Sequence, residues 1–380
     1  MGNRLVFPGF KAWPEGGMFG SRAAGSVPPA EIQAAYEAGY SGIFYDPDAK
    51  ANMRATAKAT GGVETADEAA HRFGWINAGK GQLNLPFIAV LDIWPLAWPG
   101  AAQLEGSCVG HNGKNAGLVT CATEALCGVP DEVSRIIEGP PDVPPDGQKT
   151  GVFSICGIYS LRGYRGHGWD CGSCADVMVR KGGLLVAKNY AEHGLDLTKV
   201  TSRTENITPS QIPDAIWKEA RSHQFRTSAE CESPEAIRDA HAMGIGVQSC
   251  GSEGFSSTRN EHGVARRTTS WAHAMAITGS DDRPWAHQTY GGMLVLIQNS
   301  WAKWNGGPRD IHDSAQYVPA DKKQDWIAKG IVNAETGNIM IPQGSFWARW
   351  SDVRRRSYYA MGGLSGWKRK KLPDYGGDLA

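Results

Sequence analysis

The chain has 380 residues, a formal net charge of zero and 41% hydrophobic residues, so it can form one large domain or two smaller ones with a substantial core. Because the net charge is zero, a broad basic surface that would bind nucleic acid is excluded. No apolar run reaches the roughly 18 residues that a membrane-spanning helix needs. The 48 glycines and 14 tryptophans favour an α+β domain with long loops over a helical bundle.

The eight cysteines are few for this length. The first residues contain no long apolar segment, so no secretory signal is expected. We therefore expect a cytoplasmic protein with free thiols. A virion or another exported assembly is the exception, because it can leave a cell without a signal peptide.

Residues 1–84 are expected to form an N-terminal arm followed by helices. One helix begins at Pro29 and ends near Gly39, and Thr65 caps another. The apolar face of the first helix is expected to consist of Ile32, Ala35 and Tyr36. These helices could cover the rest of the chain like a propeptide or form an integral layer. The sequence marks no cleavage site, which favours the integral layer.

A cysteine organises the segment that follows. The apolar run 84–95 predicts a strand or an extended lead-in, and a glycine turn after Gln103 leads into Cys108. A helix is expected from Cys108 to about Leu126. A thiol in the first turn of a helix lies at the positive end of the helix dipole, which favours the nucleophilic thiolate.

Three glycines lie on one face of this helix, at positions 110, 113 and 117. Because each costs roughly 1 kcal/mol against alanine, they predict the close approach of another backbone. A plain glycine-rich loop is the alternative.

The remaining elements follow from local patterns. Residues 128–149 are predicted to form a loop, and a glycine-rich loop surrounds Gly166 and Gly168. Helices are expected over 175–186, 209–223 and 233–243, and strands over 245–247, 272–278, 293–297 and 339–342. Helices first and strands later indicate an α+β architecture with two lobes. We divide the chain into an extension (1–84), a helical lobe (85–186) and a β-rich lobe (187–380).

Two polar residues in apolar segments could serve the cysteine. His273 lies in a strand-like segment, and Asn299 ends a second apolar run. A cysteine nucleophile needs a base, a group that orients the base and donors for the oxyanion. His273 and Asn299 can fill the first two roles. Gln103 and the Cys108 backbone N–H can supply the donors, and Trp301 can shield the bond between histidine and asparagine.

The order of these blocks resembles the papain-like cysteine peptidases over roughly residues 85–365, with Cys108 before a helix, His273 opening a strand and Asn299 before Ser-Trp. The resemblance implies a helical left lobe, a β-barrel-like right lobe and a cleft between them. It implies that Cys108 is the nucleophile, His273 the base, Asn299 the orienting residue and Gln103 the oxyanion donor. The substrate-binding residues are then Gly166, Gly168 and Trp301.

Several positions depart from the family pattern. Gln103 is one residue closer to the cysteine than usual, and Val109 replaces the usual tryptophan. Glu105 stands where the family has a structural cysteine. The longer interval between histidine and asparagine predicts a hairpin insertion over 281–290. These departures are typical of a distant bacterial or phage-type branch, and also of a domain that has lost activity.

Competing signals are weaker. Zinc-ligand spacing over His167, Cys171 and Cys174, with Cys156 as a fourth ligand, lacks a second matching pair. A redox CxxC motif lacks its usual βαβ surroundings. His111 is an alternative base but more typical of a solvated cleft residue. The basic runs 354–356 and 368–371 are expected to be solvated or to form an interface.

The sequence therefore predicts a thiol hydrolase that cleaves peptide or isopeptide bonds in a peptide or protein substrate. No metal, other cofactor, nucleic acid or membrane is expected to take part. The alternative is a structural component of a homo-oligomer or virion that keeps the fold with little or no activity. An amidase or transglutaminase-like relative is a third reading, which the Asn-Ser-Trp block disfavours.

Overall fold

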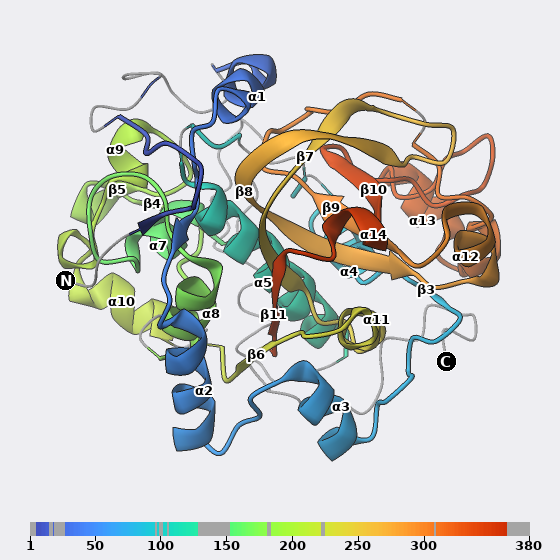
Figure 1. The fold of residues 1–380 in the computed structure, drawn as a ribbon, viewed down its shortest axis with the longest axis horizontal. Coiled ribbons are helices and arrows are strands. Elements are labelled where there is room, and N and C mark those ends of the chain that lie inside the picture. Colours follow the sequence, from blue (N-terminus) through green and yellow to red (C-terminus); the bar gives the residue numbers. More distant parts are fainter. Residues whose placement is uncertain are drawn as a thin grey trace.

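The computed structural model describes residues 5–14, 18, 27–95, 97–98, 102–104, 106–127, 153–180, 184–221, 225–307 and 309–362. Within these residues the helices between positions 108 and 221 lie together, and the main sheet lies beside them with further helices around it (Figure 1). The predicted α+β class is confirmed. The predicted loop 128–149 and the basic run 368–371 lie outside the described residues.

The α-helices are α1 (Pro29–Glu37), α2 (Ala49–Ala59), α3 (Ala66–Phe73), α4 (Phe87–Ile93), α5 (Cys108–Leu126), α7 (Ile155–Ser160), α8 (Cys171–Arg180), α9 (Ser202–Glu205), α10 (Asp214–Arg221), α11 (Pro234–Ala242), α12 (Pro284–Tyr290), α13 (Lys323–Ala328) and α14 (Trp350–Val353). Short 3-10 helices are η1 (Ala191–His193), η2 (Pro209–Gln211) and η3 (Ala315–Tyr317). The strands are β1 (Leu5–Val6), β2 (Phe44–Tyr45), β3 (Leu83–Asn84), β4 (Asn189–Tyr190), β5 (Leu195–Asp196), β6 (Ser228–Glu230), β7 (Val247–Arg259), β8 (Ala265–Asp281), β9 (Leu294–Gln298), β10 (Ser345–Arg349) and β11 (Ser357–Met361).

The main sheet is antiparallel and strongly curled. Its strand order is β10-β9-β8-β7-β11-β6, with β3 paired to β8. The long strands β7 and β8 form a hairpin whose tip returns to β10, where the Trp347 N–H donates to the Gly263 carbonyl at 3.0 Å. This return gives the sheet the expected barrel-like curvature. The sequence predicts a hairpin insertion over 281–290, but this segment contains the helix α12, which connects β8 to β9.

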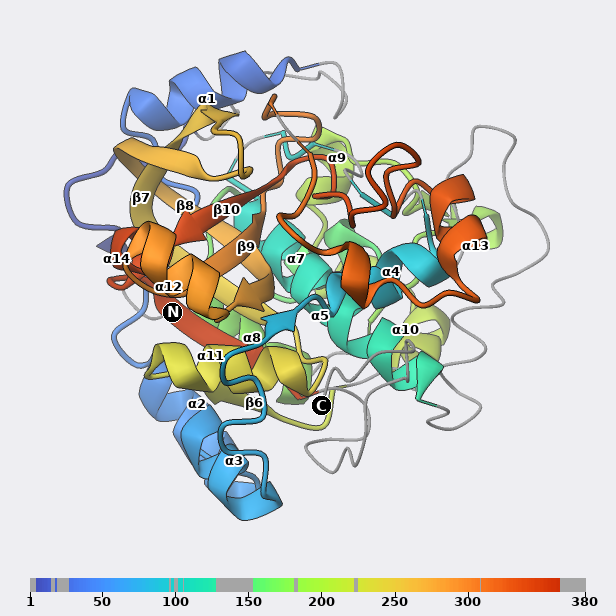
Figure 2. The ribbon, with the colours of Figure 1, turned by 90° about the vertical axis from the view of Figure 1, so that its right-hand side faces the viewer.

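Helix α5 runs between the sheet, where it contacts β7 and β8, and the helices α7 and α8 (Figures 1 and 2). Its predicted bounds are confirmed. The glycine stripe is buried, but side chains cover it where a backbone was expected. A Cβ on Gly110 would lie 2.9 Å from Tyr159 Cβ, and one on Gly117 would lie 3.2 Å from the Phe225 ring.

The close backbone approach to α5 comes from the strand side. Gly246, just before β7, donates its N–H to Thr120 Oγ1 at 2.9 Å. A Cβ on Gly246 would overlap the Ala116 carbonyl oxygen. The absence of a side chain at Gly246 thus lets the sheet contact the backbone of the central helix.

The prediction of an extended segment over 84–95 is wrong for most of its length. Residues Phe87–Ile93 form α4, which packs on α5. All but the last of its side chains are buried. A short helix that is apolar on all sides shows no 3.6-residue periodicity, so its sequence resembles a buried strand.

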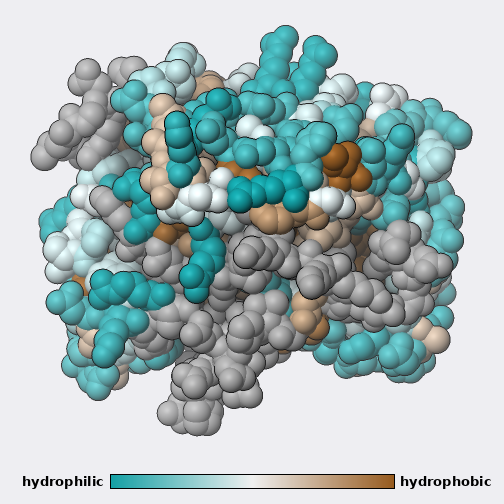
Figure 3. Space-filling view, turned by 90° about the horizontal axis from the view of Figure 1, so that it is seen from below, coloured by the Kyte–Doolittle hydropathy of each residue, from teal (hydrophilic) through white to brown (hydrophobic). Residues whose placement is uncertain are grey.

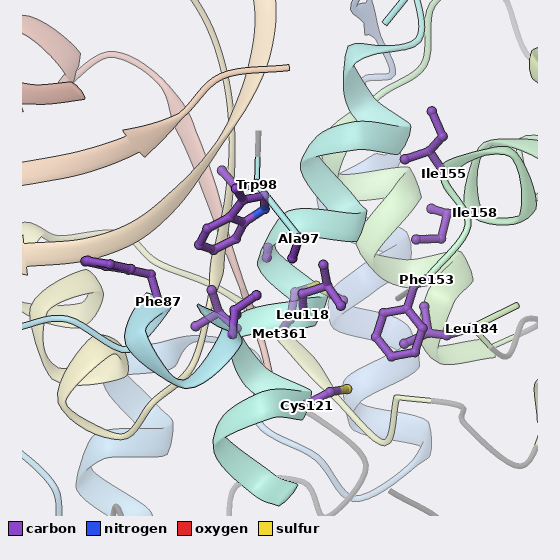
Figure 4. Close-up of a cluster of buried hydrophobic side chains, with 14 of the residues drawn as sticks. Phe87, Ala97, Trp98, Leu118, Cys121, Phe153, Ile155, Ile158, Leu184 and Met361 are labelled. Atoms are coloured by element: carbon purple, nitrogen blue, oxygen red, sulfur yellow. The ribbon is translucent and has the colours of Figure 1, made fainter. Parts of the chain in front are cut away.

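Two clusters of buried hydrophobic side chains form the core. The first surrounds α5, and Figure 4 shows part of it, including Phe87, Trp98, Leu118, Phe153 and Met361. The second lies between the other face of the sheet and α1, α3 and α11. Helices α2 and α3 pack on α8 and α11, so this part of the N-terminal region is integral to the fold, as predicted.

One disulfide joins the two parts of the fold, between Cys171 at the start of α8 and Cys250 in β7. The expectation that all thiols are free is wrong for this pair, and the other six cysteines lie outside this disulfide. The two partners are 79 residues apart in the chain. Their pairing depends on how α8 packs against the sheet, which no local pattern reveals.

No helix among the described residues is long and apolar enough to cross a bilayer. Among the described residues on the face seen in Figure 3, hydrophilic ones predominate, with apolar areas between them.

Candidate active site

Cys108 is the first residue of α5, and its side chain is fully buried. The turn before it is fixed by two residues from elsewhere in the chain. Tyr159 Oη donates to the Gly106 carbonyl at 2.8 Å. The buried Glu205 carboxylate accepts from Ser107 Oγ at 2.6 Å. These contacts hold the cysteine at the helix start.

His273 in β8 and Asn299 just after β9 form a hydrogen bond, with 2.9 Å between His273 Nε2 and Asn299 Oδ1. Asn299 Oδ1 also accepts from the Ser300 N–H at 2.7 Å, which identifies it as the oxygen. His273 Nε2 therefore carries the proton, and Nδ1 of the neutral ring is the basic nitrogen. Nδ1 has no hydrogen-bond partner among the described residues.

Trp301 lies behind the imidazole. It is fully buried and stacks on His273, with ring centroids 4.8 Å apart. This position fits the predicted shielding of the hydrogen bond between His273 and Asn299. Trp301 is assigned from sequence to substrate binding as well, and that assignment remains a prediction.

Gln103 is held beside these residues by its own backbone and side chain. Its N–H donates to the Ser300 carbonyl at 2.9 Å, and its Oε1 accepts from Ser300 Oγ. The amide Nε2 therefore points away from Ser300 and donates to Tyr36 Oη at 2.8 Å. The four residues predicted to be catalytic thus come from segments that meet at one place.

An extended stretch of the N-terminal region crosses this place. The Gly42 carbonyl accepts from Cys108 Sγ at 3.3 Å. The Gly42 N–H donates to the Ala272 carbonyl and the Phe44 N–H to the Trp169 carbonyl, each at 2.9 Å. We call residues 40–44 the cover strand. A Cβ on Gly42 would lie 2.6 Å from Cys108 Sγ, so glycine permits this approach.

The cover strand is itself held from outside. The Lys11 N–H donates to the Gly39 carbonyl at 2.7 Å, and the Ser41 N–H donates to the Lys11 carbonyl at 2.8 Å. Strand β1 pairs with β2 immediately beyond. The N-terminal region therefore combines both alternatives considered from sequence, because α2 and α3 are an integral layer and residues 36–44 cover the thiol.

Tyr36 completes the cover. Its ring packs edge-on against His273, with centroids 4.7 Å apart, and its hydroxyl bonds to Gln103 and Cys108. The predicted oxyanion donor is thus already engaged by a phenol. Cys108 Sγ also accepts from the Ala274 N–H at 3.4 Å, and none of its hydrogen bonds goes to the imidazole.

Burial keeps the cysteine and histidine uncharged here. Desolvation raises the pKa of Cys108 to about 11, against the lowering effect of the Ala274 N–H and the Tyr36 hydroxyl. Desolvation also lowers the pKa of His273 to about 3, although the bond to Asn299 favours the charged ring. The covered site therefore holds a thiol and a neutral imidazole. The helix dipole alone does not produce the predicted thiolate.

The two glycines predicted to bind substrate, Gly166 and Gly168, have different surroundings. Both have positive φ, 97° at Gly166 and 89° at Gly168. Gly168 lies against the cover strand, since a Cβ there would be 3.0 Å from the Phe44 ring. The Gly166 carbonyl accepts from Arg162 Nη2 at 2.9 Å, and a Cβ on Gly166 would meet nothing within 4 Å.

The structure does not support the alternative assignments made from the sequence, which are a zinc site, a redox CxxC pair and His111 as the base. Cys171 is bonded to Cys250, which removes it from a zinc set or a CxxC pair. No cluster suited to a metal ion occurs among the described residues. His111 is buried, so the expectation of a solvated cleft residue is wrong. Its nearest acidic neighbour is Glu205 at 4.0 Å, and burial lowers its pKa well below the usual value.

No family model matches this sequence, and no curated protein does so either. Among solved structures the chain is similar to xylellain, a cysteine protease from Xylella fastidiosa (15% identity, TM-score 0.37, 68% of this chain and 81% of that one). It is also similar to proCathepsin B S9 from Trypanosoma congolense (8%, 0.39, 74% and 77%). A third is the ragweed pollen allergen Amb a 11, a cysteine protease in its proform (14%, 0.38, 82% and 74%). The similarity to these solved structures extends over about two thirds or more of this chain, at identities of 15% or less.

Proposed function

We propose that the chain is a thiol hydrolase that cleaves peptide or isopeptide bonds, and that this structure is its covered form. The observation that carries the proposal is the extended cover strand, bound across Cys108 through main-chain hydrogen bonds to Ala272 and Trp169. Main-chain carbonyls that bind one peptide backbone in this way can bind another.

The chemistry follows from the available atoms once the cover strand has left. His273 Nδ1 takes the proton of Cys108 Sγ, and the sulfur attacks the carbonyl carbon. Gln103 Nε2 donates to the oxyanion in place of Tyr36 Oη. His273 gives the proton to the leaving amine, which departs. A water molecule then hydrolyses the thioester and restores the thiol. Asn299 keeps the imidazole in the required tautomer throughout.

The cover strand lies in a nonproductive arrangement. Its Gly42 carbonyl oxygen accepts the thiol proton, and the oxyanion donor Gln103 is occupied by Tyr36. Attack requires the opposite arrangement, with the carbonyl carbon at the sulfur and the oxygen at the donors. The cover strand is therefore expected to resist cleavage while it is bound.

The test is labelling with an epoxide probe for thiol peptidases, mapped by mass spectrometry of the full chain. Wild type should label slowly at Cys108, and Gly42→Ala, which crowds the thiol, should label faster. The double variant Gly42→Ala/Cys108→Ala should lose this modification, while the other five cysteines outside the disulfide serve as internal controls. A probe that modifies the double variant at the same rate refutes the nucleophile assignment.

The alternative of an inactive structural component makes a different prediction. Its groove would stay blocked or unreactive after the cover strand is displaced. If Gly42→Ala exposes Cys108 to a small alkylating reagent but neither takes up the epoxide probe nor hydrolyses peptides, the alternative is supported.

A further inference from the structure

Arg356 belongs to the basic run 354–356, which the sequence predicts to be solvated or to form an interface. That prediction is wrong for Arg356, whose side chain is completely buried. Its guanidinium forms an ion pair with the buried Glu253 carboxylate, with 3.3 Å between Nη1 and Oε2. A buried charge is retained only with such a partner and further hydrogen bonds.

The other donors of Arg356 reach the backbone behind the candidate base. Nη2 donates to the His273 carbonyl at 2.6 Å, and Nε donates to Ser249 Oγ at 2.7 Å. The side chain passes over Gly251, which pairs with His273 across the two strands. A Cβ on Gly251 would overlap Arg356 Cγ and lie 2.6 Å from Glu253 Oε2. Glycine at this position makes room for the ion pair.

Strand β8 is irregular at this point. Gly251 pairs with His273, and Glu253 pairs with Ser270. An interval of two residues along β7 therefore lies opposite an interval of three residues along β8. Such a bulge redirects the side chains next to it. Two consecutive carbonyls have different partners here, because Ala272 accepts from the cover strand and His273 accepts from Arg356.

We propose that Arg356, neutralised by Glu253, is a positioning residue for His273: it holds the His273 carbonyl at the bulge and so fixes where the imidazole and the Ala272 carbonyl lie. This inference rests on the proposed function, which gives His273 its role. The charge of Arg356 also lowers the pKa of Cys108, in the direction that favours the thiolate. The planar guanidinium of Arg356 reaches the carbonyl, the hydroxyl and the carboxylate from three different nitrogens, whereas an ammonium has a single nitrogen.

The experiment follows the His273 Nε2 proton in the full chain labelled with ¹⁵N-histidine, with the signal assigned by its loss in His273→Gln. In wild type this buried proton, bonded to Asn299, should exchange slowly with water. Arg356→Lys keeps the positive charge but removes the planar guanidinium that donates to the His273 carbonyl. Exchange of the Nε2 proton should accelerate about tenfold or more, since this hydrogen bond to a charged group is lost. Unchanged exchange in a folded Arg356→Lys protein overturns the proposal.

Arg238→Lys is the matched control. Arg238 is also a buried arginine paired with carboxylates, Asp239 at 2.8 Å and Asp282 at 3.5 Å, and it makes no hydrogen bond to a site residue. The Arg238→Lys substitution should lower thermal stability without changing the exchange rate of the His273 Nε2 proton. Equal acceleration in Arg238→Lys would mean that general loosening is responsible and would contradict the proposal.

A milder variant covers the case in which Arg356→Lys fails to fold. Ser249→Ala removes the hydroxyl that accepts from Arg356 Nε and leaves the ion pair intact, so exchange should rise severalfold. No change would again contradict the proposal. None of these measurements uses the reactivity of Cys108, so failure of the proposed function would appear separately, in the labelling of the uncovered thiol.

Discussion

At the scale of single residues, Gly42 determines how closely the chain approaches its own thiol. The neighbouring Tyr36 hydroxyl and Cys108 sulfur leave no room for a methyl group. This close contact makes Cys108 inaccessible and leaves the pair of Cys108 and His273 uncharged.

We predict that Gly42→Ala destabilises the covered form by about 1–3 kcal/mol, the usual cost of overpacking. Labelling of Cys108 should then accelerate about 5- to 150-fold, since each 1.4 kcal/mol corresponds to tenfold. Gly292→Ala is the control, because its Cβ would meet nothing within 4 Å and its φ is not positive. Equal rates for both variants would argue against the role given to Gly42.

Some residues of the candidate site could be predicted from the sequence, and others could not. Cys108, His273 and Asn299 could be selected because each lies in a recognisable block, and the structure brings their segments together. Tyr36 could be predicted as buried, but its partner Gln103 is 67 residues away. Arg356 looks exposed in its local run, because Glu253, which makes its burial possible, is 103 residues away.

At the scale of elements, the contact between α5 and the start of β7 ties the helix that carries Cys108 to the sheet that carries His273. Gly246 lies on the Ala116 carbonyl, a backbone atom inside a buried helix. A flexible side chain could move aside, but this carbonyl cannot move without displacing α5.

We therefore predict that Gly246→Ala lowers the free energy of unfolding by about 3 kcal/mol, at the upper end of overpacking costs. Thermal and urea denaturation of the full chain would measure it, with Gly292→Ala expected to stay within about 0.5 kcal/mol of wild type. A Gly246→Ala protein as stable as wild type would show that the two elements can separate freely.

The elements that could be predicted carry local signals. Thr65 caps α3 and accepts from the Glu68 N–H, and Ser233 caps α11 in the same way. Helix α4 has no polar face to reveal its period. The bulge in β8 depends on contacts with Arg356 and the cover strand, which sequence patterns near His273 do not contain.

At the scale of the whole molecule, several histidines are buried in the neutral form. Burial lowers the pKa of His167 and His241 to about 4 and that of His273 to about 3. Unfolding lets each of them bind a proton below its ordinary pKa of about 6.5. Asp170, whose pKa burial raises to about 6, acts in the opposite direction but is a single group.

The folded chain should consequently lose stability as the pH falls from about 6.5 toward 4, by up to about 1.4 kcal/mol per pH unit for each excess proton taken up on unfolding. Urea midpoints measured at pH 7.5 and pH 5 would show the loss. His241→Gln should reduce the slope, because it removes one such proton. A midpoint that stays constant or rises on acidification would contradict this.

The cover strand has a kinetic consequence. If a reagent can reach Cys108 only after residues 40–44 leave, the observed labelling rate cannot rise without limit as more reagent is added. We predict that it reaches a plateau equal to the rate constant of departure and that the plateau is independent of protein concentration, as a unimolecular gate requires. Stopped-flow or quench measurements over a wide reagent range would reveal it, and strictly linear dependence up to high concentration would mean that departure is never limiting.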